Sequence, residues 1–233
     1  MGFGAPASVL FDFGGTLDAD GVRWAERFHH AYRAEGGTLD FEAFEPLFRA
    51  TDRDLLTDSG TRSLGFQAMV SAQARLIVQA SPDAPRIDAR RVAARFHAAA
   101  TEVIKRNRPI LVRLRRHSRL GVVSNFTGNL DRCLAELGLS ELFTTVADSA
   151  VVGREKPDPR IFVQALADLG AAPEESWMVG DNFEADIRPA NGLGLRTCWL
   201  APANRPSPPG AAFTARIARL PELVSAMEAA CTG

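Results

Sequence analysis

The feature that most constrains this chain is a set of short apolar runs, each bounded by polar or turn-forming residues. Runs of this kind predict buried strands, which we expect over residues 9–11, 120–123, 144–147, 177–179 and 197–200. From Pro109 onward helical patterns alternate with these runs, beginning with a short helix expected over residues 110–114. Strands that alternate with helices form a parallel sheet with helices on both faces, so we predict an α/β fold with a Rossmann-like core.

A different pattern occupies residues 22–106, where no strand is predicted. Trp24, Phe28 and Tyr32 recur every four residues, as apolar residues do on one face of a helix. We therefore expect an all-helical domain inserted into the α/β core. The expected boundaries are residues 1–20 and 107–233 for the core and 21–106 for the helical insertion.

The composition excludes several classes of protein. Apolar residues make up 46% of the chain, charged residues 24%, and the formal net charge is −1. These values are ordinary for a globular protein, whereas strong electrostatic binding to nucleic acid or to a membrane needs a larger charge imbalance. Cys133, Cys198 and Cys231 are too far apart in sequence for a zinc motif or a disulfide framework. We expect a cytoplasmic protein without nucleic-acid or membrane partners, and monomer and homodimer both stay open.

Polar residues follow three of the predicted strands. Asp12 follows the first, Ser124 the second, and Asp181 the fourth, while Lys156 lies in a proline-containing loop and has only Lys105 as a fellow lysine. Because the carboxyl ends of parallel strands meet at one edge of a sheet, we expect these side chains to converge there. Paired carboxylates suit Mg²⁺, and a hydroxyl and an ammonium suit the oxygens of a phosphoryl group. An aspartate facing phosphorus can act as a nucleophile and form an aspartyl-phosphate.

Four motifs carry these residues in order along the chain. They read Asp12-Phe13-Gly14-Gly15-Thr16-Leu17, Val123-Ser124-Asn125, Lys156-Pro157-Asp158-Pro159 and Gly180-Asp181-Asn182-Phe183-Glu184-Ala185-Asp186. In order and spacing, from about residue 8 to 200, the sequence resembles the haloacid dehalogenase superfamily, in the branch with a helical cap inserted after the first motif. The resemblance implies a Mg²⁺-dependent phosphatase that acts on a small phosphorylated substrate.

The resemblance also implies a role for each motif residue. Asp12 would be the nucleophile, and Lys156 would neutralise charge on the nucleophile and the phosphate. The metal ligands would be Asp12, the backbone carbonyl of Gly14, and Asp181. Ser124 and the backbone amide of Asn125, with Lys156, would bind phosphate, while Thr16 and Asp186 would support the site.

Gly14 departs from the family pattern, because phosphatases of the family carry a second aspartate there that protonates the leaving group. General acid–base catalysis is worth about 10²–10⁴ in rate, so turnover by this chain is in question, and Gly14→Asp is expected to raise hydrolysis of an aryl phosphate. Asp18 and Asp20 are candidate substitutes, but their Asp-Ala-Asp-Gly context favours a role in a turn.

Three alternatives to an efficient phosphatase follow from this departure. A phosphate-binding or regulatory protein with little turnover is the main alternative. A dehalogenase ranks lower, because such relatives lack the acidic fourth motif that Asp181 and Asp186 provide here. Phosphonoacetaldehyde cleavage is disfavoured, because it needs a lysine in the cap and no lysine precedes Lys105.

Overall fold

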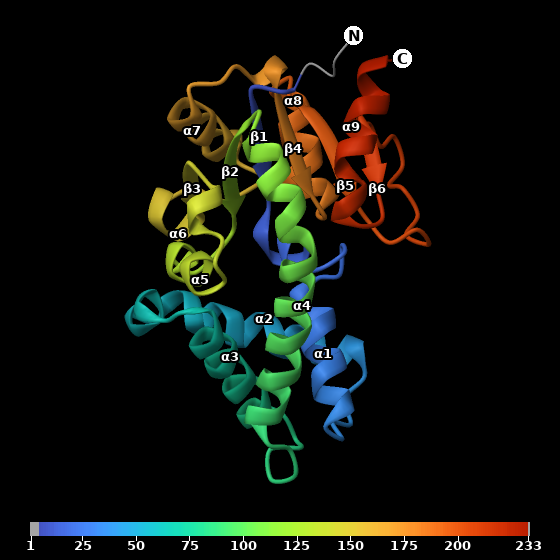
Figure 1. Cartoon of the computed structure of the whole chain (residues 1–233). Helices are drawn as coiled ribbons and strands as arrows, with labels where there is room; N and C mark the ends of the chain where they lie inside the picture. Colours follow the sequence, from blue (N-terminus) through green and yellow to red (C-terminus); the bar gives the residue numbers. More distant parts are fainter. Residues whose placement is uncertain (1–4, 233) are drawn as a thin grey trace.

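A computed structural model describes residues 5–232, which contain a six-stranded sheet in the order β3-β2-β1-β4-β5-β6 (Figure 1). Every neighbouring pair is parallel. The strands are β1 (Ser8–Phe11), β2 (Arg119–Ser124), β3 (Thr145–Asp148), β4 (Ser176–Gly180), β5 (Arg196–Leu200) and β6 (Ala215–Ile217). The prediction of a Rossmann-like parallel sheet is confirmed. The sixth strand was not predicted, because its three residues follow a Pro-rich loop and show no apolar run.

Helices cover both faces of this sheet and also form a layer of their own. The α-helices are α1 (Trp24–Ala34), α2 (Phe41–Thr57), α3 (Phe66–Ala80), α4 (Ala89–Arg115), α5 (Leu130–Glu136), α6 (Ser149–Val152), α7 (Pro159–Leu169), α8 (Arg188–Gly192) and α9 (Leu223–Thr232). Short single turns are η1 (Phe13–Leu17), η2 (Ser59–Ser63), η3 (Ser140–Leu142), η4 (Pro173–Glu175), η5 (Phe183–Ile187) and η6 (Leu220–Glu222). Among the residues described, no helix combines the length and the apolar character needed to cross a bilayer.

Alternate residues of the central strands point to opposite faces of the sheet, as the pleat requires. Leu10 belongs to an apolar cluster with Met178 and with Ile161 and Phe162 of α7. Val9 and Phe11 belong to another, which includes side chains of α4 and α9. Both faces of the sheet are therefore buried, and its functional groups are confined to the strand ends.

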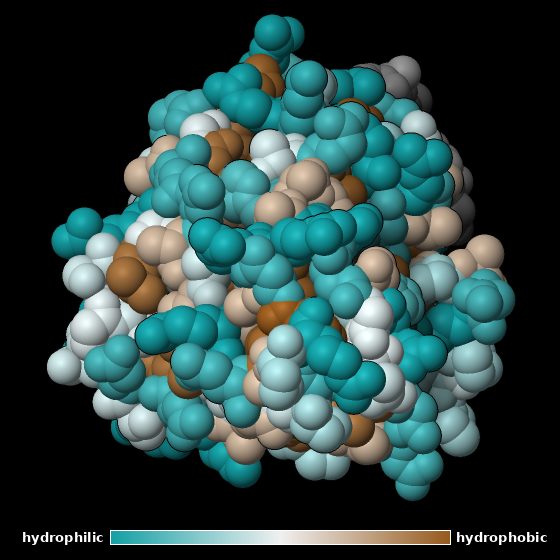
Figure 2. All heavy atoms as spheres, turned by 90° about the horizontal axis from the view of Figure 1, so that it is seen from below, coloured by the Kyte–Doolittle hydropathy of each residue, from teal (hydrophilic) through white to brown (hydrophobic). Residues whose placement is uncertain are grey.

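The helices α1–α3 and the first part of α4 lie beyond the carboxyl ends of the strands, and we call them the helical layer (Figure 1). Its interior is aromatic, with Phe28 stacked on Phe96 at 4.1 Å between ring centroids and Tyr32 packed near Phe44. Seen from this end the surface is mostly hydrophilic, with hydrophobic residues scattered singly (Figure 2). The layer therefore has its own core and meets the strand ends on its inner side.

The helix α4 runs unbroken for 27 residues, so the prediction of a separate short helix after Pro109 is wrong. A proline inside a helix removes one backbone hydrogen bond, but packing on both sides of it can outweigh that loss. Ile104 packs before Pro109, and Leu111 and Leu114 pack after it, all in the same buried cluster. The boundary expected at residues 106/107 therefore falls within a continuous helix.

Two contacts join α4 to the segment that enters the helical layer. Arg106 forms a two-pronged ion pair with Asp20, with N–O distances of 2.9 and 2.6 Å. One residue further on, the Asn107 side chain donates a hydrogen bond to the carbonyl of Leu17 at 3.1 Å. The two places where the chain passes between sheet and helical layer are thus tied to each other.

Candidate functional site

Asp12 lies directly beyond the carboxyl end of β1, and its backbone N–H donates to the carbonyl of Val179 on β4 at 2.9 Å. Its Oδ1 accepts hydrogen bonds from Ser124 Oγ at 2.9 Å and from Lys156 Nζ at 2.6 Å. These groups come from three separate parts of the chain. The convergence expected from the strand ends is therefore present around one carboxylate oxygen.

Lys156 is almost fully buried between two carboxylates, since its Nζ also lies 2.5 Å from Asp186 Oδ1. The Asn125 side chain clamps the backbone of Lys156: its Oδ1 accepts from Lys156 N at 2.7 Å and its Nδ2 donates to Lys156 O at 2.9 Å. Burial by itself would lower the pKa of Lys156, but the charges of Asp12 and Asp186 raise it above its ordinary value. The ammonium is therefore held charged and in place beside Asp12.

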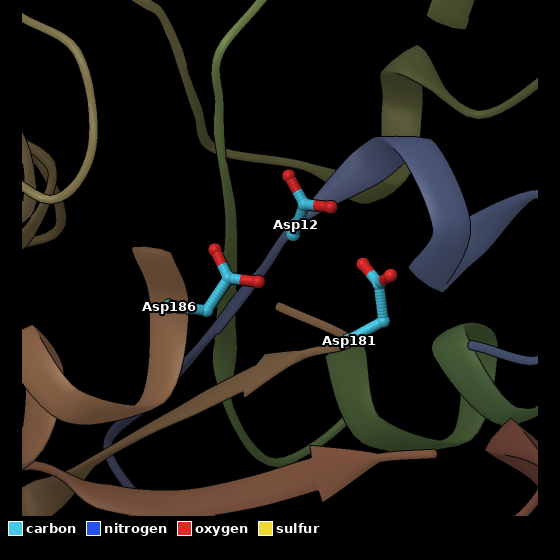
Figure 3. Close-up of side chains that lie close together, drawn as sticks. All are labelled: Asp12, Asp181 and Asp186. Atoms are coloured by element: carbon cyan, nitrogen blue, oxygen red, sulfur yellow. The ribbon is translucent and has the colours of Figure 1, made fainter. Parts of the chain in front are cut away.

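Three carboxyl groups converge beside this lysine (Figure 3). Asp12, Asp181 and Asp186 each offer an oxygen within 4.8 Å of the others, and all three are buried. Thr16 donates to Asp181 Oδ1 at 3.3 Å, and the indole N–H of Trp199 donates to the Asp181 carbonyl at 3.0 Å. One ammonium does not balance three carboxylates, so the cluster carries negative charge that a divalent cation would offset.

The pKa values of Asp181 and Asp186 reflect the same excess of negative charge. Burial, followed by the negative charges of Asp12 and Asp186, raises the pKa of Asp181 well above its usual value. Burial also raises the pKa of Asp186 to about 6, although Lys156 opposes that rise. Asp186 is tied to Lys156 and accepts from Asn182 N at 3.0 Å, whereas Asp181 makes no ion pair with any described residue. Hard oxygen donors of this kind fit Mg²⁺.

Gly15 is needed where the chain turns beneath Asp181. Its φ of +98° is a backbone conformation that residues with a side chain rarely adopt. A Cβ at this position would also lie 2.7 Å from Asp181 Oδ2. The Gly-Gly pair after Asp12 therefore allows the first motif to pass close to the fourth.

Gly14 has an ordinary φ of −77°, but the space beside it is filled. A Cβ on Gly14 would lie 3.1 Å from Nε1 of Trp24. The indole is held by edge-to-face contacts with five phenylalanine rings at centroid distances of 5.1–6.4 Å, namely Phe13, Phe28, Phe66, Phe96 and Phe126. Its Nε1 also donates to Asp18 Oδ2 at 2.8 Å. Trp24 therefore occupies the room that a side chain at position 14 needs.

This packing reverses the expectation that Gly14→Asp raises hydrolysis. The new carboxylate would meet a fixed indole and push against the turn that carries Asp12. Small displacements of reacting groups are costly, so we expect hydrolysis of 4-nitrophenyl phosphate to fall roughly tenfold in Gly14→Asp. Steady-state release of 4-nitrophenol measures this change.

Gly14→Ala is the matched control for that variant, because it adds the Cβ without the charge. A similar loss in both variants would show that crowding by Trp24 causes it. An increase in Gly14→Asp over the wild-type rate would contradict the steric account.

Asp18 and Asp20 are structural, as their turn context favoured. Asp18 is fully buried and accepts from Gly15 N at 2.7 Å and from Arg27 at 2.5 Å, while Asp20 pairs with Arg106. Neither residue lines the cavity above Asp12. They anchor the helical layer to the first motif and do not supply the missing acid from these positions.

That cavity, of about 490 Å³, opens above Asp12, Ser124, Lys156 and Asp181. Its far wall is formed by the helical layer, chiefly by one side of α2 together with residues of α1 and α3: Arg23, Trp24, Glu45, Phe48, Arg49, Asp52, Leu55, Met69 and Gln73. The polar members of this wall were not predicted from the sequence. A polar helix face that looks into a cavity has the same periodicity as one that faces bulk water.

The sequence of this chain is similar to those of known hydrolases. The family model of the haloacid dehalogenase-like hydrolases matches residues 7–194. The phosphoserine phosphatase of Thermus thermophilus is 41% identical over 110 residues, a match that covers 47% of this chain and 44% of the relative. The glyceraldehyde 3-phosphate phosphatase of Methanopyrus kandleri is 31% identical over 197 residues, which cover 82% of each chain.

A solved structure gives the same fold. The HAD hydrolase YfnB of Bacillus subtilis, determined with bound magnesium, superposes with a TM-score of 0.59 at 18% identity, and the match covers 95% of this chain and 98% of that one. Since the family model covers strands β1–β4 and all four motifs, the chain belongs to the haloacid dehalogenase-like hydrolases.

Proposed function

We propose that this protein is a Mg²⁺-dependent phosphatase that hydrolyses a small phosphorylated metabolite through an aspartyl-phosphate on Asp12. The observation that carries the proposal is the environment of Asp12, whose carboxylate meets Ser124 Oγ and Lys156 Nζ at the floor of a cavity of about 490 Å³. The phosphatase names of two relatives support the same reaction class.

Mg²⁺ would be held by Asp12 and Asp181 together with the backbone carbonyl of Gly14. When bound, it would offset the negative charge of the carboxylates and of the phosphoryl group. The surplus of carboxylates over ammonium groups, and the raised pKa of Asp181, support a cation at this place. Asp186 would instead keep Lys156 in position, and Thr16 would orient Asp181.

Each residue at the floor of the cavity has its own role in the transfer of the phosphoryl group. Asp12 attacks phosphorus, while Ser124, the amide of Asn125 and Lys156 bind the phosphoryl oxygens. Lys156 also donates to Asp12 Oδ1 at 2.6 Å and so holds the attacking carboxylate in place. Water then attacks the aspartyl-phosphate and releases inorganic phosphate.

The proposal extends to the organisation of the chain. Residues 1–20 and 107–233 would form the catalytic core, and residues 21–106 would act as a cap that shields the reaction from bulk water. The position of the helical layer beyond the strand ends supports this division (Figure 1). The unpaired cysteines Cys133 and Cys198 fit the reducing conditions of the cytoplasm, where we place the reaction.

A panel of phosphate esters tests the proposal, with inorganic phosphate measured in Mg²⁺ and again after removal of metal by a chelator. We expect release from at least one small ester in Mg²⁺ and a loss of about 10²-fold or more without it. Restoring Mg²⁺ should restore the rate. Release that is equally fast in the chelator would overturn the metal-dependent mechanism.

A second candidate is a phosphate-binding protein with little turnover, and the packing of Trp24 against Gly14 favours it. Under this alternative no ester in the panel would be hydrolysed, yet inorganic phosphate or vanadate would still bind in Mg²⁺. Calorimetric titration with vanadate separates the two functions, because a phosphatase shows both binding and turnover.

A further inference from the structure

The reaction proposed above needs a proton for the oxygen that leaves phosphorus, and Gly14 has no group to supply one. Trp24 fills the adjacent space, so no side chain can be placed there without moving the indole. The donor must therefore come from another wall of the cavity. Apart from the three aspartates of the floor, the carboxyl groups that line the cavity are Glu45, Asp52 and Glu155.

Asp52 is carried on α2, on the side of the helix that faces the cavity. Glu45, Arg49, Asp52 and Leu56 follow each other at spacings of three or four residues and all line this space. Such spacings place side chains along one face of a helix. Asp52 therefore belongs to the wall supplied by the helical layer, whereas Asp12, Ser124 and Lys156 line the opposite side of the same cavity, at the strand ends and the loop beside them.

Glu45 forms ion pairs with two arginines and is therefore poorly suited to donate a proton. Its Oε1 accepts from Arg49 at 3.0 Å and from Arg23 at 3.2 Å. The hydrogen bond from Arg49 and the nearby positive charges lower the pKa of Glu45. Glu45 is thus held as a carboxylate that fixes the two guanidinium groups.

Asp52 is in the opposite situation. Asp52 is an exposed residue that lines the cavity, and its side chain makes no hydrogen bond or ion pair with any residue that the structure describes. Although Asp52 is exposed, neighbouring protein atoms displace part of the water around its carboxyl group, which disfavours the charged form and raises the pKa of Asp52. A general acid must reach the cavity and must carry a proton to donate. Asp52 lines the cavity, has no ion-pair partner and has a raised pKa, so it fits this role.

We propose that Asp52 is the catalytic acid of this enzyme and protonates the leaving oxygen from the cap, in place of the residue that Gly14 lacks. This inference rests on the proposed phosphatase function. As the bond between Asp12 Oδ and phosphorus forms, the ester P–O bond breaks and its electron pair stays on the leaving oxygen. That oxygen takes the proton of the Asp52 carboxyl group. In the second step the Asp52 carboxylate takes a proton from the attacking water, whose oxygen bonds to phosphorus while the bond between phosphorus and Asp12 Oδ breaks. Inorganic phosphate leaves, and the Asp12 carboxylate and the protonated Asp52 are restored.

The test compares leaving groups that differ in their need for a proton. The dinitrophenolate of 2,4-dinitrophenyl phosphate leaves without protonation, whereas the alkoxide of glycerol 2-phosphate does not. In Asp52→Asn, we expect the first-turnover rate to fall about 10²–10⁴-fold for glycerol 2-phosphate and to stay within about threefold for the dinitrophenyl ester. First-turnover measurement isolates phosphoryl transfer from the later hydrolysis of the aspartyl-phosphate. Phenyl and 4-nitrophenyl phosphates should give intermediate losses.

Asp54→Asn is the matched control. Asp54 is exposed on the same helix, as Asp52 is, but it does not line this cavity, so both esters should react at wild-type rates. An equal loss on all esters in Asp52→Asn, or no loss on any, would overturn the assignment. The assignment would also fail if Glu155→Gln, rather than Asp52→Asn, showed the dependence on the leaving group.

Failure of this inference can be told apart from failure of the proposed function. Hydrolysis of the dinitrophenyl ester needs Asp12 but no acid. If Asp12→Asn abolishes it and Asp52→Asn spares every ester, the phosphatase stands and its acid lies elsewhere. If Asp12→Asn leaves it intact, the proposed function itself fails.

Discussion

Asp12→Asn is expected to lower Mg²⁺-dependent phosphate release by about 10⁴-fold or more. An amide has the shape of a carboxylate but cannot attack phosphorus to form an acyl phosphate. The hydrogen bonds from Ser124 and Lys156 to Oδ1 can persist with an amide oxygen, so the protein should keep its fold. Phosphate release from the best ester of the panel measures the effect, and mass spectrometry of acid-quenched enzyme measures the phosphoenzyme.

Asp131→Asn provides the control, because Asp131 is exposed on α5 and outside the cavity. It should leave both readouts unchanged. A phosphorylated species that persists in Asp12→Asn would place the covalent bond on another residue and would contradict the role given to Asp12.

Lys156→Met should affect both stability and catalysis. Removal of one partner from a buried ion pair leaves uncompensated charge, which typically costs about 3–5 kcal/mol in the free energy of unfolding. Here the methionine would leave Asp12 and Asp186 without the ammonium that lies 2.6 and 2.5 Å from them. Phosphate release should fall by about 10²–10³-fold, as when a positioned donor to a transition-state oxyanion is lost.

The stability loss of Lys156→Met should depend on pH. Without the ammonium, the pKa of Asp186, already raised to about 6 by burial, rises further in the folded state. A carboxyl group with a raised pKa binds its proton more tightly when folded, so stability falls as pH rises above the unfolded value of about 4. Denaturant unfolding in a chelator should therefore show a larger deficit at pH 8 than at pH 5.

The other lysine of the chain supplies the control for this variant. Lys105 is exposed on α4, and Lys105→Met should change the free energy of unfolding by no more than about 0.5 kcal/mol. Equal stability of Lys156→Met and the wild type at pH 8 would mean that the buried pair contributes nothing, against the geometry of the site.

The floor of the site could be predicted from the sequence because its geometry follows from simple rules. Asp12, Ser124 and Asp181 each come directly after or at the end of a short buried strand, and parallel strands bring those ends to one edge. The position of Lys156 could not be predicted from the strand ends, because no strand carries it. It was predicted from the motif that contains it. In the structure Thr16 contacts Asp181 and Asp186 contacts Lys156.

The cavity wall could not be predicted in the same way, because tertiary packing decides it. The periodicity of α2 places Asp52 and Asp54 on different sides of the helix, but it does not show which side lines the cavity. Likewise, the four-residue repeat of Trp24 and Phe28 indicates a helix face but does not show that the indole fills the space beside Gly14. The prediction of a separate helix after Pro109 was wrong for a related reason, because packing on both sides of Pro109 keeps α4 continuous.

The unbroken course of α4 has a mechanical consequence. At 1.5 Å per residue it is a rod of about 40 Å, with one end embedded among the aromatic rings of the helical layer and the other against the sheet. Any movement of the helical layer relative to the sheet must either carry the whole rod or bend it, and bending is least costly at Pro109, where a backbone hydrogen bond is already missing. How readily the cavity above Asp12 opens therefore depends on how tightly Leu111 and Leu114 pack against the sheet, although neither residue lines the cavity.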